Sequence, residues 1–363
     1  MRDAYNFCAG PAALPEAVMR QAQAEFLAYG DERASIMEVS HRGAAFTAIV
    51  EKAEQDLKDL LNIPDNYHVL FMHGGATAQF FAVPMNLLGN KTTADYIHTG
   101  LWSKKALEEG KRYTDAHCVT SLSEAIPLAI PDASTWSFSK DPAYVHYADN
   151  ETITGVEFSS IPVVPEGVPL ICDMSSNFLS RAFDVSRFGL IYAGAQKNVG
   201  PSGMAVVIIR DDLLNRALAI TPTIYRYALQ AKAHSCVNTP STFSIYLAGL
   251  CFQWLKDQGG IAAMEAINRQ KAQKIYAAID QHPETYRNEI AIPNRSRMNV
   301  TFKCKTEALD KQFVTEAAKQ GLINLAGHRE YGGQRASLYN AIPLAGVDAL
   351  AAFMIDFANQ HER

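Results

Sequence analysis

The chain has 363 residues, a length that predicts roughly two domains at about 150 residues each. Apolar residues make up 48% and charged residues 20% of it, as in ordinary globular proteins. The net charge of −5 lacks the basic excess that nucleic acids and anionic membranes attract, and no apolar run approaches the about 20 residues of a membrane span. Because the amino terminus has no apolar signal region and the six scattered cysteines form no CxxC pair, we expect a cytoplasmic protein with reduced thiols and no metal site.

The first sixty residues predict two amphipathic helices. Pro15 and Glu16 suit the first turn of a helix, apolar residues follow at positions 18, 22 and 26, and Gly30 ends the pattern. The second helix has an apolar stripe over residues 46–60 and stops before Pro64.

Short apolar segments then alternate with helical or loop segments as far as about residue 210. The predicted strands are residues 69–72, 96–98, 144–147, 170–172, 191–193 and 205–209. This alternation predicts an α/β fold with a largely parallel, buried sheet. Ligands of such sheets bind at the carboxyl ends of the strands. Residues 74–77, Thr152, Asp173 and Lys197 follow strands in this way.

The last third of the chain predicts a smaller α+β unit. A helix over residues 244–255 precedes the pair Gly259 and Gly260, the best hinge candidate, and a long helix begins at Ile261. Strands are expected near residues 298–302, 322–325 and 336–339, and a closing helix over residues 347–358. We therefore expect an N-terminal segment over residues 1–15, a large domain over 16–259 and a small domain over 260–363.

Asp173 and Lys197 are the candidate catalytic pair. Lys197 lies among small residues between two apolar strands, where desolvation disfavours an ammonium and lowers its pKa, as a Schiff-base lysine requires. A carboxylate at Asp173 could keep a pyridine nitrogen protonated, so the pair favours pyridoxal phosphate as cofactor. The alternatives are a helix N-cap at Asp173 and a surface turn at Lys197.

Three further features could contact such a cofactor. The segment HGGATAQF offers glycines and free N–H groups to a phosphate, and it is neither a Walker loop nor a GxGxxG fingerprint. Trp102 could stack on an aromatic ring or belong to the core. The hydroxyl of Thr152 could reach a ring substituent.

Two turns carry clustered cationic groups. His41 and Arg42 lie in SHRG, and His328, Arg329 and Arg335 lie in GHREYGGQRASLYNA. Arginine binds carboxylates and phosphates in a fork-like geometry, so these turns indicate an anion site. The alternative is a pair of solvated basic turns.

The motifs NFCAGPAALP, SHRG, HGGATAQF, NET, AQKNVGPSG, NTPSTF and GHREYGGQRASLYNA resemble the phosphoserine aminotransferase family, in order and along essentially the whole chain. This family belongs to the fold-type-I, class V enzymes that depend on pyridoxal 5′-phosphate. The resemblance implies a large domain with a mostly parallel sheet flanked by helices and a smaller C-terminal α+β domain. It also implies a homodimer with active sites at the subunit interface.

The resemblance assigns a role to each candidate. It makes Lys197 the Schiff-base lysine, Asp173 the partner of the pyridine nitrogen, Trp102 the stacking residue and Thr152 a ring contact. Residues implied to hold the cofactor phosphate are Ala76, Thr77 and Gln196, with Asn238 and Thr239 of the neighbouring subunit. Residues implied to hold substrates are Arg335 for the α-carboxylate, and His41 and Arg42 with His328 and Arg329 of the other subunit for the phosphate or γ-carboxylate.

The implied reaction converts 3-phosphohydroxypyruvate and L-glutamate to O-phospho-L-serine and 2-oxoglutarate, in L-serine biosynthesis. Bacterial relatives also transaminate a 4-phosphohydroxy-threonine in pyridoxine biosynthesis. Two positions depart from some relatives: Thr77 replaces an Arg, and Ala9 replaces a Ser, so a side-chain contact there would be lost. The alternatives are another class V enzyme such as a cysteine desulfurase, although Gln196 stands where a His typically precedes the lysine, and a non-catalytic anion-binding protein.

Overall fold

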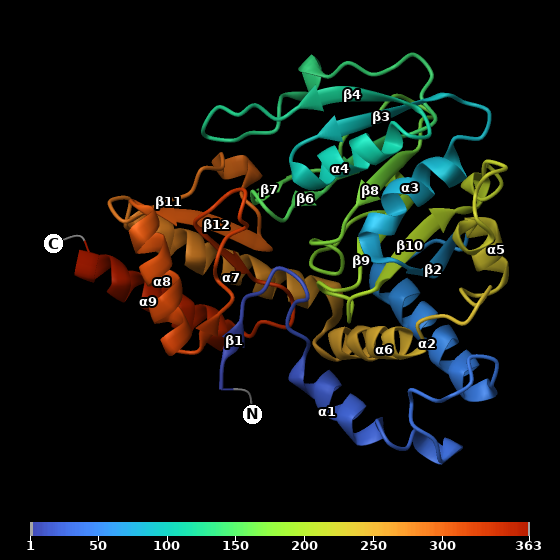
Figure 1. The fold of residues 1–363 in the computed structure, drawn as a ribbon, viewed down its shortest axis with the longest axis horizontal. Coiled ribbons are helices and arrows are strands. Elements are labelled where there is room, and N and C mark those ends of the chain that lie inside the picture. Colours follow the sequence, from blue (N-terminus) through green and yellow to red (C-terminus); the bar gives the residue numbers. More distant parts are fainter. Residues whose placement is uncertain (1–2, 362–363) are drawn as a thin grey trace.

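A seven-stranded sheet forms the centre of the larger part of the molecule (Figure 1). The computed structural model describes residues 3–361. In spatial order, the strands are β2 (Tyr67–His73), β10 (Met204–Arg210), β9 (Leu190–Gly194), β8 (Leu170–Asp173), β5 (Val145–Ala148), β3 (Thr93–His98) and β4 (Asp115–Ser121). All adjacent pairs from β9 to β4 are parallel, whereas β10 runs antiparallel to both of its neighbours. The α/β prediction with a mostly parallel sheet is confirmed.

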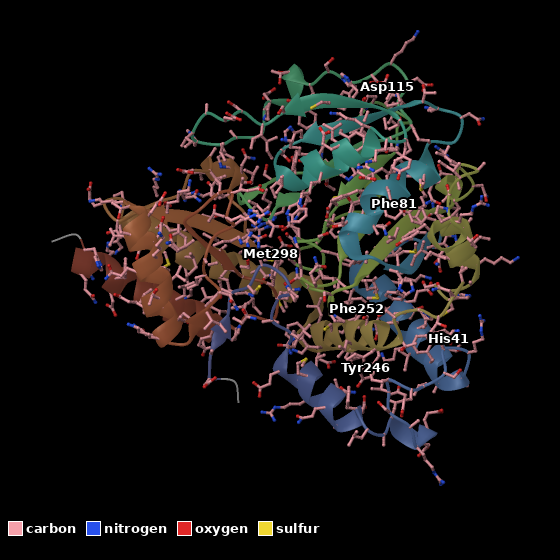
Figure 2. The ribbon with its side chains drawn as sticks, in the orientation of Figure 1. His41, Phe81, Asp115, Tyr246, Phe252 and Met298 are labelled. Atoms are coloured by element: carbon pink, nitrogen blue, oxygen red, sulfur yellow. The ribbon has the colours of Figure 1, made fainter. Side chains whose placement is uncertain are left out.

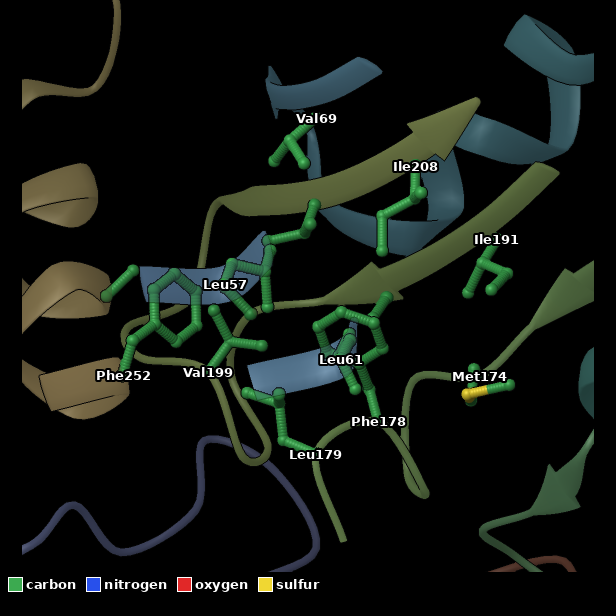
Figure 3. Close-up of a cluster of buried hydrophobic side chains, with 14 of the residues drawn as sticks. Leu57, Leu61, Val69, Met174, Phe178, Leu179, Ile191, Val199, Ile208 and Phe252 are labelled. Atoms are coloured by element: carbon green, nitrogen blue, oxygen red, sulfur yellow. The ribbon is translucent and has the colours of Figure 1, made fainter. Parts of the chain in front are cut away.

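Helices cover both faces of this sheet. Alternate residues of a strand point to opposite faces, so Val69 and Phe71 belong to one apolar cluster and Leu70 and Met72 to another. The helices α2 (Ala44–Leu61) and α6 (Thr242–Asp257) contribute to the first cluster, and α3 (Gly75–Leu87) and α4 (Leu101–Gly110) to the second. Figure 3 shows Leu57 of α2 and Phe252 of α6 in the first cluster, beneath the strands.

A second unit, at the left of Figure 1, has its own core. It contains α7 (Gly260–Gln281), α8 (Glu307–Lys319), α9 (Leu344–His361) and a sheet of β11 (Tyr286–Arg287), β12 (Asn299–Cys304) and β14 (Gln334–Ser337). Phe302, Phe313, Phe353 and Phe357 stack edge to face in its centre. Because this cluster is separate from the other two, it supports the proposed division at residues 259 and 260, which stays a proposal.

The N-terminal segment packs on the second unit. Its strand β1 (Tyr5–Asn6) pairs in parallel with β13 (Leu322–Ile323), and Phe7 is fully buried in the cluster of that unit. The chain then enters α1 (Glu16–Glu25), which contacts α6 on the large unit. Residues 3–15 therefore connect the two units.

Buried polar groups fix the segment after β14 within the small unit and join it to the large unit. Lys271 of α7 is fully buried, and its ammonium donates hydrogen bonds to the backbone carbonyls of Leu338, Tyr339 and Ile342, at 3.2, 2.9 and 3.0 Å. The N–H of Asn340, within this segment, donates to Asn198 Oδ1 at 3.0 Å. The segment after β14 is thereby fixed beside the residue that follows Lys197.

The structure confirms the six predicted strands of the large sheet and the helices expected at both ends of the chain. It adds β4, α8, the short helix α5 (Tyr227–Lys232) and the two-residue strands β6 (Asn150–Glu151) and β7 (Val156–Glu157). Within residues 3–361, no helix combines the length and apolar character needed to cross a bilayer.

Candidate active site

A cavity of about 320 Å³ lies at the carboxyl ends of β5, β8 and β9, within the size range of small-ligand pockets. It brings together seven sequence-predicted residues, which are Ala76, Thr77, Trp102, Thr152, Asp173, Gln196 and Lys197. The remaining wall is formed by Gly10, Pro11, Gly74, Gly75, Phe80, Asn150, Ser175, Ser202 and Gly203. Strand ends, a helix terminus and the N-terminal segment therefore meet at one place.

Lys197 is buried in this cavity, with 8% of its surface exposed. Its Nζ donates hydrogen bonds to Thr152 Oγ1 at 2.5 Å and to Ser176 Oγ at 2.8 Å, and the two hydroxyls are 2.8 Å apart. Burial lowers the pKa of Lys197 to about 8; the charge of Asp173 opposes this effect and the charge of Arg335 reinforces it. The result is a fixed amine that is substantially neutral at mildly alkaline pH.

Asp173 ends β8 and is also 8% exposed. Its Oδ1 accepts a hydrogen bond from the N–H of Ser175 at 3.0 Å. Burial raises the pKa of its carboxyl group, while hydrogen bonds from Ser175 and Tyr192 and the charge of Lys197 act in the opposite direction. The local bond to Ser175 is of the kind a helix cap makes, but turns and not a helix follow Asp173. The N-cap alternative therefore accounts for one bond and not for the position in the cavity.

The first turn of α3 forms the wall beside Gly74. Gly74 adopts a left-handed conformation with φ of 87°, and a Cβ there would lie 2.6 Å from Ala78 Cβ, so only glycine fits. The N–H groups of Gly75, Ala76 and Thr77 belong to the first helical turn, which has no intrahelical acceptors for them. These donors and the helix dipole suit an anion.

The backbone of Trp102 is held by the carboxylate of Glu151. Glu151 is fully buried, and its carboxylate accepts hydrogen bonds from the N–H groups of Trp102 and Ser103, each at 2.9 Å, and from Ser103 Oγ at 2.6 Å. A Cβ at Gly100 would lie 2.5 Å from Glu151 Cδ, so glycine is required for this approach. Trp102 Nε1 itself is buried without a partner among residues 3–361, and Lys105 Nζ lies 4.8 Å from the centre of the indole, which also lines the cavity.

Arg335 lies next to the cavity and not in its wall. It belongs to β14 of the small unit and donates from Nη1 to the backbone carbonyl of Thr152 at 3.1 Å. Burial lowers the pKa of its guanidinium, which stays charged because arginine does not deprotonate in proteins. The backbone carbonyl of Ala9 accepts a hydrogen bond from the Tyr339 hydroxyl at 2.9 Å, so this contact of Ala9 is made by its main chain.

Besides Arg335, six predicted residues lie outside the cavity wall of the single chain. They are His41, Arg42, Asn238, Thr239, His328 and Arg329. Figure 2 places His41 at the outer edge of the large unit, in the segment before α2. Arg42, Thr239 and Arg329 are exposed, and the other three are half-buried. The single chain therefore does not bring together the predicted phosphate pocket.

Sequence reasoning missed three groups around the cavity. Ser176 holds the amine of Lys197, Glu151 holds Trp102, and Asn198 donates to the carbonyls of Ser176 and Phe178 at 3.0 and 2.9 Å. Ser176 and Asn198 lie close in sequence to Asp173 and Lys197, which is a usable signal. Glu151 lies in the motif NET, but no local pattern reveals its contact with Ser103, because the two residues are 48 positions apart.

Cysteine chemistry finds no support in this cavity. None of its lining residues from the described part of the chain is a cysteine. The six thiols are free, and burial raises the pKa of Cys172, Cys251 and Cys304. Residues 3–361 also contain no group of three potential metal ligands.

A family model for aminotransferase class-V matches residues 4–350. The chain therefore belongs to the class-V aminotransferase family. Phosphoserine aminotransferase of Acinetobacter baumannii (strain ACICU) is 57% identical to it over 359 residues, and that of Pseudomonas aeruginosa (strain LESB58) is 54% identical over 358 residues. Each alignment covers 99% of both chains. The expected resemblance to the phosphoserine aminotransferase family is confirmed.

Solved structures agree with this assignment. Phosphoserine aminotransferase from Bacillus circulans subsp. alkalophilus superimposes with a TM-score of 0.95 at 45% identity, covering 99% of each chain. The PLP-bound phosphoserine aminotransferase from Trichomonas vaginalis superimposes with a TM-score of 0.93 at 44% identity, covering 97% of this chain and 99% of that one. The expected fold class is thus confirmed by close structural relatives.

Proposed function

We propose that the chain is a pyridoxal-phosphate-dependent transaminase that converts 3-phosphohydroxypyruvate and L-glutamate to O-phospho-L-serine and 2-oxoglutarate. The observation that carries this proposal is the buried amine of Lys197 in one cavity with Asp173, in a chain of this family. A lysine with a lowered pKa and a carboxylate for a ring nitrogen are the two groups that this cofactor requires.

The residues of the cavity fit pyridoxal phosphate. When bound, this cofactor supplies an aldehyde that condenses with amines and a ring that draws electrons from the reacting carbon. Lys197 would hold the aldehyde carbon, Asp173 the ring nitrogen, and the first turn of α3 the phosphate. Trp102, whose Nε1 lacks a partner among residues 3–361, would cover one face of the ring.

Lys197 also serves as the group that moves the proton. Its released amine takes the proton from Cα of glutamate, which requires a neutral Nζ, and a pKa of about 8 makes this form available. Thr152 and Ser176 accept hydrogen bonds from Nζ and so fix the amine while it holds the proton. Because Lys197 is almost fully buried, few waters compete for the proton.

The substrates bind through their anionic groups. Arg335 lies beside Thr152 and would bind the α-carboxylate that glutamate and phosphoserine share. The phosphate or the γ-carboxylate would bind to His41 and Arg42, together with His328 and Arg329. Those four residues lie outside the cavity wall of one chain, so the proposal requires a second copy.

A homodimer with the active sites at its interface meets this requirement. Asn238 and Thr239 lie in the segment before α6, outside their own cavity wall, and Asn238 Oδ1 is buried without a partner among residues 3–361. In the proposed dimer these two residues reach the cofactor phosphate of the other subunit. A second chain would also bring His328 and Arg329 to the pocket of its partner.

The wider setting follows from the same proposal. We place the enzyme in L-serine biosynthesis and, through a phosphorylated hydroxythreonine, in pyridoxine biosynthesis. The six free thiols suit the cytoplasm, where disulfides are rare. The domain limits proposed above, residues 1–15, 16–259 and 260–363, accord with a cavity lined by the first two of these parts and with Arg335 of the third beside it.

An absorption spectrum tests the proposed function. The purified protein should be yellow, lose the colour on addition of glutamate and regain it on addition of 3-phosphohydroxypyruvate. Lys197→Ala should bind the cofactor without turnover, whereas Lys311→Ala, on the exposed face of α8, should behave like the wild type. A protein that is colourless and binds anions would favour the non-catalytic alternative, and release of sulfide from cysteine would favour a desulfurase.

A further inference from the structure

A line of three side chains runs from Asp173 into the sheet, away from the cavity. Asp173 of β8 is the register partner of Tyr192 on β9, so the two side chains lie on the same face of the sheet, and Tyr192 acts to lower the pKa of the Asp173 carboxyl group against burial. The Tyr192 hydroxyl in turn lies 2.8 Å from His146 Nε2, on β5. Strands β9, β8 and β5 are consecutive neighbours in the sheet, so the line crosses three strands.

The far end of the line is closed to solvent. His146 is 2% exposed, and its ring stacks on Tyr192 at 5.9 Å and lies against Tyr96 at 5.3 Å. His146 Nδ1 is buried with no hydrogen-bond partner among the described residues. An imidazolium would need acceptors for both of its N–H groups, and only one is present, so burial lowers the pKa of His146 to about 3.

The orphaned nitrogen determines the direction of the hydrogen bonds. If Tyr192 donates to an ionised Asp173, then its oxygen is free to accept from His146 Nε2–H, and Nδ1 carries only a lone pair. In the opposite arrangement a protonated Asp173 donates to Tyr192, Tyr192 donates to His146 Nε2, and the proton of His146 moves to Nδ1. That arrangement buries an N–H without an acceptor, which native proteins rarely tolerate.

The ionisable groups around the line do not supply a competing proton. Tyr96, Tyr144 and Tyr227 share the apolar cluster of Tyr192, Cys172 lies on the other face of the sheet, and burial raises the pKa of each. Those that act on Asp173 itself are Lys197, whose charge favours the carboxylate, and Glu151, a buried acid. Near neutral pH, the aromatic groups therefore stay uncharged, and Asp173 is the group in the line that can carry a charge.

We infer that His146 and Tyr192 are positioning residues that keep Asp173 ionised and aimed into the cavity, through the relay His146 Nε2–H to Tyr192 hydroxyl to Asp173 carboxylate. The single tautomer that His146 can adopt without burying an unpaired N–H favours one direction of the relay. The inference rests on the proposed function only in that this function gives Asp173 a cofactor nitrogen to bind. The relay itself is a property of the sheet.

The tautomer can be observed directly. In the full chain loaded with pyridoxal phosphate and labelled with ¹⁵N-histidine, His146 should show a protonated Nε2 and an unprotonated Nδ1 from about pH 5.5 to 8.5, across the range in which ordinary histidines titrate. A protonated Nδ1, or a charged ring, would overturn the relay. This result does not depend on whether the protein transfers amino groups.

Substitutions test whether the relay acts through Asp173. Tyr192→Phe removes the donor to the carboxylate and should lower kcat for glutamate by about tenfold to a hundredfold, the range for a hydrogen bond to a charged group. His146→Phe keeps the ring stacked and should cost less, about threefold to tenfold, because it removes only the second bond. Tyr144→Phe, whose hydroxyl pairs with Tyr96 in the same cluster, is the matched control and should stay within about twofold.

Two readouts separate positioning from a general structural role. Loss of a donor raises the pKa of Asp173, so the acid limb of kcat/KM should move to higher pH in Tyr192→Phe. In an Asp173→Asn background, Tyr192→Phe should change kcat no further. An unmoved acid limb, or full additivity with Asp173→Asn, would overturn the inference. A wild-type protein that transfers no amino group would instead refute the proposed function and leave the tautomer result to decide the relay.

Discussion

Burial changes the chemistry of Lys197 without any neighbouring base. An ordinary lysine has a pKa of about 10.4 and is almost entirely protonated near neutral pH. The desolvated amine of Lys197 has a pKa of about 8, and its two hydroxyl partners fix its direction. The same side chain can therefore act as a nucleophile and as a proton carrier.

The pH dependence of acetylation tests whether the pKa of Lys197 is lowered. In cofactor-free protein, acetylation of Lys197 by acetic anhydride should rise about tenfold per pH unit up to about pH 8 and then level off, because only the neutral amine reacts. Peptide mass spectrometry would follow Lys197 beside the exposed Lys311 in the same digest. A midpoint for Lys197 near pH 10 would contradict the buried environment.

The two arginines of the proposed substrate pocket should respond differently to the two amino donors. Arg329→Ala should lower kcat/KM for phosphoserine more than for glutamate, by about tenfold or more, because a phosphate dianion gains more from each cation than a carboxylate does. Arg335→Ala should affect both donors similarly, since both carry the same α-carboxylate. Single-turnover rates for both donors measure the difference. Equal losses for Arg329→Ala would mean that the phosphate lies elsewhere.

Some of the site could be predicted from local sequence, and some could not. Lys197 and Asp173 stand out because a charged residue after an apolar strand is unusual and its chemistry is specific. The contribution of His146 depends on which strands are neighbours, and no spacing along the chain reveals that β5, β8 and β9 are adjacent. The positions of His41 and Arg329 remain predictions, because a single chain does not complete their pocket.

Helix α4 depends on a carboxylate from another element. Its first N–H groups would be unsatisfied in a buried site, and Glu151 of β6 accepts two of them. Burial raises the pKa of Glu151, and the hydrogen bonds from Ser103 and Trp102 oppose that effect. The acid therefore fixes the start of α4 and, with it, the indole that faces the cavity.

Glu151→Gln tests this dependence. The amide places an N–H₂ group opposite a backbone N–H, so we expect the free energy of unfolding to fall by about 1 to 3 kcal/mol and cofactor affinity to fall with it. Urea unfolding and titration with pyridoxal phosphate would measure the two effects. Glu108→Gln, on the exposed side of the same helix, should change neither. Unchanged cofactor affinity in Glu151→Gln would show that Trp102 is held in other ways.

The elements themselves were predictable where their burial was uniform. Six strands of the large sheet are largely buried and mostly apolar, a pattern that alternates visibly with helices. Strand β4 was missed because it forms the sheet edge and carries polar residues such as Asp115, His117 and Thr120. The helix α8 was missed because only Phe313 and Ala317 of it are buried, too few to mark a period.

A mixing experiment can decide whether each proposed active site is built from two chains. Lys197→Ala and Arg329→Glu should each be inactive toward phosphoserine as separate proteins. Unfolded together and refolded, they should recover about a quarter of wild-type activity, because half of the dimers are hybrids and each hybrid has one intact site. Recovery on mixing is measured against each variant refolded alone. No recovery would place Arg329 in the site of its own chain.

The pairing of β1 with β13 has a consequence for the order in which the molecule is completed. A ribosome releases Tyr5 first and its partner Leu322 only near the end of synthesis. The strands of the large sheet lie between residues 67 and 210, so they can pair before the partner strand of the N-terminal segment has been synthesised. Gly10 and Pro11 belong to the N-terminal segment and form part of the cavity wall. The nascent chain thus acquires Lys197 early and the last side of its cavity only when translation is nearly finished.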